Sequence, residues 1–289
     1  LWVDRTHDWL SRGLCWPSRW VDGFFADPLS TSNEPAASLV RITGERTWRD
    51  DGLDDRDLDV DARVWLPSAE RRLSLLFRSN EDDTVADGPQ ASEVTGIGED
   101  DSGFRGALRW VINRTEAMDL DLDTGVRSDL TTFTRLRYRS VHPLFNEWAW
   151  LRFTERVEWR DPKGWRSRSL FEVDRALSDT ASVRLASEIQ YSEELNEDGR
   201  GLGLFQGANL FLRQSDKAAW NLGAGAAGFT KPEARVDSYR CYVRYRRQVW
   251  RPWLFVEVEP FVLWPRDQGY QGVNGVTVRL ETLFGRLDG

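Results

Sequence analysis

The feature that most constrains the fold is a period-two alternation that runs through segments longer than ten residues. Residues 236–250 show it clearly, because Arg240, Arg244 and Arg246 share one face of an extended chain while apolar and aromatic side chains occupy the other. Such alternation is typical of β-strands with two different faces. Strands in soluble proteins average about five or six residues, whereas a tilted membrane strand needs about 9–11. The pattern therefore predicts strands long enough to cross a membrane.

The same alternation predicts an all-β, antiparallel transmembrane β-barrel of about fourteen strands over residues 37–289, with twelve strands as the alternative count. Short turns alternate with longer loops between the expected strands, except for two short outer turns at 128–130 and 161–164. An even count places both ends of the barrel in the periplasm. Residues 1–36 form a separate amphipathic segment. The expected strands cover 38–48, 57–66, 72–80, 104–114, 118–127, 132–141, 147–160, 164–177, 180–194, 201–214, 218–230, 236–250, 253–264 and 275–284.

Tryptophan positions give an independent indication of a barrel. The chain has 15 tryptophans, and the expected strands place many of them near one end or the other. Two such bands are typical of the aromatic girdles of membrane barrels. The band at the periplasmic ends would hold Trp65, Trp110, Trp148, Trp150, Trp220, Trp250 and Trp253, and the band at the outer ends Trp48, Trp159, Trp165 and Trp264.

The last expected strand resembles the C-terminal sorting signal of Gram-negative outer-membrane β-barrel proteins. Val276 to Phe284 alternate apolar residues and end near an aromatic residue, although a tail of residues 285–289 departs from the usual terminal aromatic. The resemblance covers about 250 residues at the level of pattern and points to no family of known activity. It implies a bacterial outer-membrane location. Since no signal-peptide pattern stands at Leu1, we expect the numbering to begin with the mature chain.

A soluble β-sandwich is the competing fold. It would point its apolar faces inward, leave the girdle tryptophans at its rims and expose very long, arginine-rich strands without evident edge protection. The barrel accounts for the same residues without these difficulties.

Charges in two expected hairpins match across the strands. A turn near Asp129 and a turn at residues 251–252 each set carboxylates opposite arginines, and such cross-strand pairs are stabilising. We expect these side chains to face the lumen, because an arginine at the lipid midplane costs about 2–4 kcal/mol. They form either a selectivity surface for a charged solute or structural packing of a polar interior. The expected lumen residues are Asp119, Asp121, Asp123, Arg135, Arg137, Arg139, Arg240, Arg244, Arg246, Glu257, Glu259, Arg279 and Glu281.

The N-terminal segment has a different pattern. Tryptophan and arginine each recur every seven residues, which predicts an amphipathic helix with a break or a new start at Pro17. Three placements remain open: a plug inside the barrel, an interfacial helix on the inner leaflet, or a docking element for a periplasmic or envelope partner. The repeating residues are Trp2, Arg5, Trp9, Arg12, Trp16 and Arg19.

Composition excludes several other functions. The net charge of -8 argues against a nucleic-acid partner. Cys15 and Cys241 have no metal-ligand spacing, although a disulfide between them is compatible with the sequence. We expect no cofactor, no metal and no catalytic residues. The acidic stretch 81–103 lacks an ordered calcium motif and is interpreted as a solvated loop, with divalent bridging to lipopolysaccharide as the alternative.

These patterns favour passive or gated passage of a small polar or charged solute through a narrow lumen lined by arginine, aspartate and glutamate. The expected surroundings are outer-membrane lipid and lipopolysaccharide. The first alternative is a structural or assembly protein whose N-terminal helix docks an envelope partner. The second is a lipid-modifying barrel enzyme, for which His7 and His142 are the only histidines and no nucleophile motif is evident.

Overall fold

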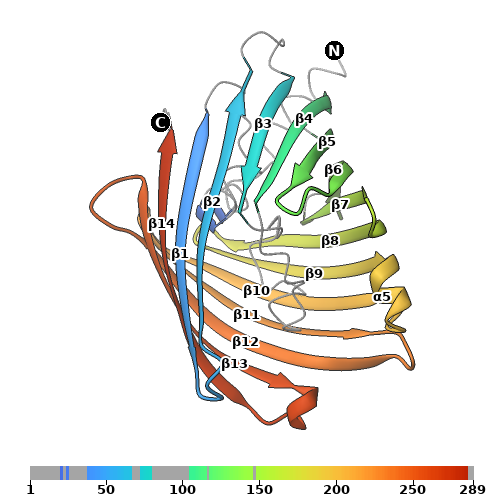
Figure 1. Ribbon diagram of the computed structural model, residues 1–289. Coiled ribbons are helices and arrows are strands. Elements are labelled where there is room, and N and C mark those ends of the chain that lie inside the picture. The colour runs from blue at the N-terminus through green and yellow to red at the C-terminus, as the bar shows by residue number, and fades with distance from the viewer. Residues whose placement is uncertain are drawn as a thin grey trace.

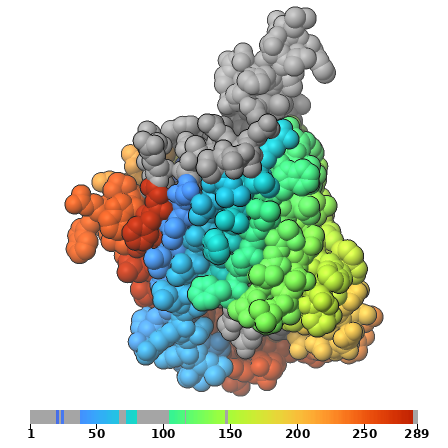
Figure 2. Space-filling view, turned by 45° about the horizontal axis from the view of Figure 1, so that its top comes forward, coloured from blue at the N-terminus to red at the C-terminus, as the bar shows by residue number. Residues whose placement is uncertain are grey.

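The chain folds into a single sheet that closes on itself. The computed structural model describes residues 20–21, 24–25, 38–66, 72–79, 104–115, 117–145 and 148–285. Fourteen antiparallel strands follow one another in chain order, and β1 pairs with β14 to complete the barrel. Figure 1 shows the tilted strands around the wall, and Figure 2 shows β1 beside β14 on the outer surface. The predicted fourteen-stranded barrel is confirmed, and the count of twelve is wrong.

The strands lie close to the expected ranges. Most span ten residues or more, whereas β3 is shorter. Their bounds are β1 Leu39–Arg49, β2 Asp55–Trp65, β3 Leu73–Arg78, β4 Arg105–Arg114, β5 Met118–Arg127, β6 Thr132–Leu144, β7 Ala149–Arg160, β8 Gly164–Ser178, β9 Ala181–Ser192, β10 Gly203–Ser215, β11 Ala218–Phe229, β12 Arg235–Gln248, β13 Leu254–Pro265 and β14 Val273–Gly285.

The two faces of the barrel are inverted relative to a soluble protein. Along most strands polar or charged side chains alternate with apolar ones, and many of the charged ones are buried in the interior. Large apolar side chains such as Leu58, Val126, Leu185 and Leu280 stand exposed on the outside. A soluble sandwich would bury its apolar faces instead, so that alternative is wrong.

Connections at the two ends differ in length. The described turns beside the C-terminal end of β14 are tight, as between β8 and β9 and between β10 and β11. The opposite end carries longer connections, including the short helix α5 (Glu193–Glu197) and the 3-10 turn η1 (Arg266–Gln268) (Figure 1). In the β5–β6 turn, the Thr131 hydroxyl and backbone N–H donate to Asp129, and these hydrogen bonds lower the pKa of that carboxyl.

Within the described segments, no helix is long and apolar enough to cross a membrane.

The aromatic bands are present with two corrections. Trp110, Trp148, Trp220, Trp250 and Trp253 are exposed near the end with the tight turns, and Trp48, Trp159 and Trp165 near the other end. Trp65 and Trp150 were expected in the first band but are buried. Each shares strand parity with buried charged residues and therefore points inward. Their strand positions matched the girdle, but the alternation placed them on the inner face.

Candidate functional site

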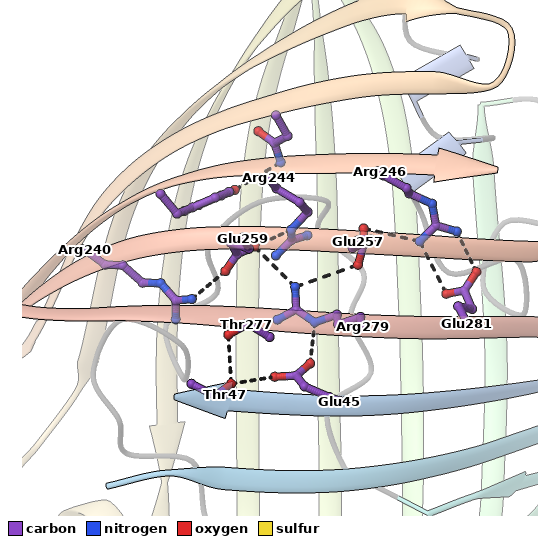
Figure 3. Close-up of polar contacts among 12 residues, drawn as sticks. Glu45, Thr47, Arg240, Arg244, Arg246, Glu257, Glu259, Thr277, Arg279 and Glu281 are labelled. Atoms are coloured by element: carbon purple, nitrogen blue, oxygen red, sulfur yellow. Dashed lines mark hydrogen bonds and ion pairs between the residues drawn. The ribbon is translucent and has the colours of Figure 1, made fainter. Parts of the chain in front are cut away.

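One side of the lumen is covered by a continuous network of ion pairs. We call the inner faces of β12, β13, β14 and β1 the paired wall. At its centre lies Glu259, which is 0% exposed and contacts three arginines. Its carboxylate accepts from Arg240 at 2.6 Å, from the Arg244 side chain, and from Arg279 at 3.3 Å (Figure 3). One carboxylate therefore holds guanidinium groups from β12 and β14 together.

The network continues along the paired wall in both directions. Arg246 contacts Glu281 at 2.6 Å and Glu257 at 3.4 Å. Across the β1–β14 seam Arg279 also pairs with Glu45, and the Thr47 and Thr277 hydroxyls lie 2.8 Å apart (Figure 3). The two expected pairs between β12 and β13, Arg246 with Glu257 and Arg244 with Glu259, are both present. These contacts lock four strands in one register.

The hairpin β5–β6 has the expected register but only part of the expected pairing. Asp119, Asp121 and Asp123 stand opposite Arg139, Arg137 and Arg135. Of the pairs expected from that register, Asp121 and Arg137 form an ion pair.

The other two aspartates find arginines on the other flank of β5. Asp123 instead binds Arg109 on β4 through two contacts of 2.7 Å, and Asp119 lies 3.6 Å from Arg114. Arg135 donates to Glu158 on β7 at 2.8 Å. Each inward side chain has neighbours on two flanking strands, so the register of one hairpin does not by itself determine its partner.

The opposite side of the lumen holds more arginines than carboxylates. We call the inner faces of β3 to β8 the arginine wall. Register places Arg137, Arg156 and Arg168 directly side by side on β6, β7 and β8. Among the described inward residues of this wall, the arginines are Arg78, Arg105, Arg109, Arg114, Arg127, Arg135, Arg137, Arg139, Arg152, Arg156, Arg160, Arg166 and Arg168, and the carboxylates are Asp119, Asp121, Asp123, Glu158, Glu172 and Asp174.

Most of this wall was not singled out from the sequence. A signal was available, because Arg105 and Arg109 on β4, and Arg152, Arg156 and Arg160 on β7, stand at even spacings and so share one face. Applying the same parity rule to every expected strand would have predicted an arginine-rich side.

A sector with small residues separates the two walls. Gly223 on β11 lies under the ring of Tyr242, so closely that an added Cβ would fall 2.2 Å from a ring carbon. Asn221 donates to the Tyr242 hydroxyl at 3.1 Å, and that hydroxyl donates to Asn209 at 2.7 Å. The small side chains of this strand therefore make room for an aromatic ring of the wall itself.

Three described aromatic residues of the N-terminal segment lie against inward-facing side chains of the barrel. Phe24 packs against Phe255 with ring centroids 6.0 Å apart, and Phe25 packs against Phe211 at 5.5 Å. Both partners are buried on inward positions of β13 and β10. The Arg246 guanidinium lies 5.9 Å from the Phe24 ring centroid. Trp20 and Val21 are also described, and Arg213 lies 6.0 Å from the Trp20 ring centroid.

The heptad residues of the N-terminal prediction, Trp2, Arg5, Trp9, Arg12, Trp16 and Arg19, lie outside the described residues. The helix over 1–36 and its partners therefore stay predictions. Cys15, His7 and the acidic stretch 81–103 also lie outside them.

Other chemistry was searched for in the described part of the chain. It contains no group of three metal-ligating side chains placed to hold an ion. His142 is exposed at the end of β6 and lies opposite Leu151. Cys241 is a free thiol exposed on the outer face.

The closed wall, its apolar outer face and its charged interior define a β-barrel of the outer-membrane type. No family model and no curated protein matches the chain. Among solved structures, OmpT, an outer membrane protein of Vibrio cholerae, aligns with 88% of this chain and 99% of its own at a TM-score of 0.50 and 10% identity. At that identity the likeness shows the fold alone.

Two further solved structures align at lower scores. The outer membrane channel DcaP of Acinetobacter baumannii covers 87% of this chain and 99% of its own at a TM-score of 0.47 and 8% identity. A KdgM porin in complex with disordered oligogalacturonate covers 84% and 98% at a TM-score of 0.42 and 10% identity.

Proposed function

We propose that the protein is an outer-membrane channel that passes a small, charged solute through a narrow lumen. The observation that carries this proposal is the inversion of the two barrel faces, with buried charges inside and exposed apolar residues outside. An apolar outer face suits the lipid interior. Fourteen strands leave room for a narrow path lined by side chains, and the charged walls select which solutes follow it.

Part of the N-terminal segment obstructs that path. Phe24 and Phe25 reach inward-facing aromatic residues on β13 and β10, two strands on one side of the lumen. Val21 is only 1% exposed, which places it inside the molecule rather than at a lipid surface. These contacts favour a plug over an interfacial helix, so passage is gated by release of this segment.

The test is single-channel conductance of the full-length protein in a planar bilayer. The double variant Phe24→Ala/Phe25→Ala removes the aromatic contacts of the obstruction and is expected to give larger or more frequent openings. Phe153→Ala/Phe171→Ala is the matched control, because these rings pack together on the outer face with centroids 4.8 Å apart. Equal conductance of the two double variants would exclude an obstruction of the lumen by Phe24 and Phe25.

If the folded native protein and both folded variants gave no conductance, the channel function would be excluded. The structural or assembly function would then lead, because a lumen packed by ion pairs would serve stability alone. Recovery of a stoichiometric envelope partner that binds through residues 1–30 would support that alternative.

Charge selectivity is tested on the paired wall. Arg244→Gln/Arg246→Gln leaves Glu257, Glu259 and Glu281 with fewer positive neighbours, so the reversal potential in a salt gradient should move toward cation preference. An unchanged reversal potential would exclude these arginines from selectivity.

A further inference from the structure

Two neighbouring arginines face outward near one end of the barrel. Arg46 on β1 stands directly opposite Arg56 on β2. Both share strand parity with exposed apolar residues such as Trp48 and Leu58, and they therefore point away from the lumen. The turn that joins β1 to β2 lies at the end of the barrel opposite to the C terminus (Figure 1). This is the end with the longer connections, which we expect to be the outer one.

The two guanidinium groups have no acidic partner within the described part of the chain. The Nε atom of Arg46 is buried and has no hydrogen-bond acceptor there. Carboxylates of the nearby turn bind elsewhere, because Asp51 pairs with Arg49 and Asp50 accepts from Asn274 at 2.8 Å. Like charges directly opposite each other destabilise a sheet. An anion bound between the two arginines would offset that repulsion.

The height of this pair in the wall is set by an aromatic ring. The Arg46 guanidinium lies 4.8 Å from the centroid of the Trp48 ring, which belongs to the exposed band at the outer end. Tryptophan rings favour the membrane–water interface, and the cost of an arginine on the lipid face falls toward that interface. The positive charges therefore lie at the level of lipid headgroups.

The surface beside the two arginines is apolar toward the membrane centre. Ile42 on β1 and Leu58 and Val60 on β2 occupy the next outward positions. Gly44 stands opposite Leu58, and a Cβ added to it would meet no atom within 4 Å. Open space between apolar side chains therefore adjoins the charges. A lipid has an acyl chain to fill such a space, whereas a free inorganic anion does not.

We infer that Arg46 and Arg56 form a binding site for a phosphorylated lipid of the outer leaflet. Directly opposed residues have Cβ atoms about 4.5–5.5 Å apart, so two planar guanidinium forks reach the oxygens of one phosphate. Trp48 holds one fork in place, and the apolar surface of β1 and β2 contacts the acyl chains. The site faces away from the lumen and goes beyond the proposed channel.

Native mass spectrometry of the full-length protein in detergent tests the site, with diphosphorylated lipid A as the probe. Arg46→Gln/Arg56→Gln should weaken lipid A binding roughly tenfold or more, because the phosphate loses two charged donors. The matched control is Arg175→Gln/Arg247→Gln, which removes two outward-facing arginines from the other end of the barrel and changes the net charge equally. This control should bind lipid A like the native protein.

Two further probes distinguish a lipid phosphate from other ligands. Lipid A without its phosphates should bind the native protein roughly tenfold more weakly, and inorganic phosphate should not displace the intact lipid. Displacement by inorganic phosphate would assign the arginines to a free anion and overturn the lipid site. Equal binding of the two forms of lipid A would also overturn it, because acyl chains alone would then account for binding.

The variants provide the remaining contradicting outcomes. Equal lipid A affinity in the native protein and in Arg46→Gln/Arg56→Gln would exclude these arginines. Equal weakening in both double variants would show that net charge, rather than this pair, attracts the lipid. No binding to a native protein shown by circular dichroism to be folded would exclude the site as well.

Discussion

The paired wall and the arginine wall use the same residue types in different proportions. On the paired wall, Glu257, Glu259 and Glu281 are interleaved with four arginines, each of which forms an ion pair with at least one of them (Figure 3). On the arginine wall, Arg137, Arg156 and Arg168 lie side by side. The first arrangement stabilises the sheet by itself. The second places like charges side by side, which is unfavourable in a sheet, even though Arg137 and Arg168 also pair with Asp121 and Glu188.

This difference teaches how one barrel can separate structural from functional charge. Breaking a buried ion pair leaves an uncompensated charge and is costly. Removing one of several neighbouring arginines relieves repulsion instead. The same type of substitution should therefore change the free energy of unfolding far less on the arginine wall than on the paired wall.

The largest effect is expected at Glu259. Glu259→Gln keeps the shape of the side chain but leaves Arg240, Arg244 and Arg279 without their shared carboxylate. The free energy of unfolding should fall by about 3–5 kcal/mol, the usual cost of breaking a buried pair. Urea unfolding followed by tryptophan fluorescence measures it. Glu197→Gln, at an exposed position of α5, is the control. A loss below about 1 kcal/mol would show that water already screens this network.

An intermediate effect is expected in the sector between the walls. Gly223→Ala must displace the Tyr242 ring and with it the hydrogen bonds to Asn221 and Asn209. Overpacking of this kind costs about 1–3 kcal/mol. Gly44→Ala is the matched control, because no atom lies within 4 Å of an added Cβ there. Equal unfolding midpoints for the two variants would mean that the ring moves freely and that this sector has no tight packing.

The smallest effect is expected on the arginine wall. Arg156→Gln removes the middle charge of the row formed with Arg137 and Arg168. Relief of the repulsion within the row offsets part of what the substitution removes, so the free energy of unfolding should change by less than about 1 kcal/mol, and the reversal potential should show weaker anion preference. A loss of stability as large as that of Glu259→Gln would contradict the contrast between the walls.

Much of the fold followed from local patterns. Alternation fixed the strands to within a few residues, because a side chain on the wrong face would place charge in lipid. Turn chemistry near Asp129 predicted the β5–β6 register correctly. Both signals act between residues that are close in the sequence.

Other features depended on contacts between strands that local sequence patterns do not determine. Asp123 binds Arg109 on β4 although Arg135 stands opposite it on β6. Which flanking strand supplies the partner depends on side-chain geometry. Trp65 matched a girdle by its height in the wall and yet points inward. The row of Arg137, Arg156 and Arg168 forms only when β6, β7 and β8 are paired in register.

The pair between Arg279 and Glu45 lies at the junction of the last and first strands. Until the ends of the sheet meet, each of these residues stands on an open edge. A slip of one residue at this junction would turn every inward side chain of one edge strand toward lipid. A slip of two would set Arg279 opposite Thr43 or Thr47 in place of Glu45. The pair between Arg279 and Glu45 therefore selects the correct register when the barrel closes. The stable unit in the membrane is then the closed barrel rather than any single hairpin.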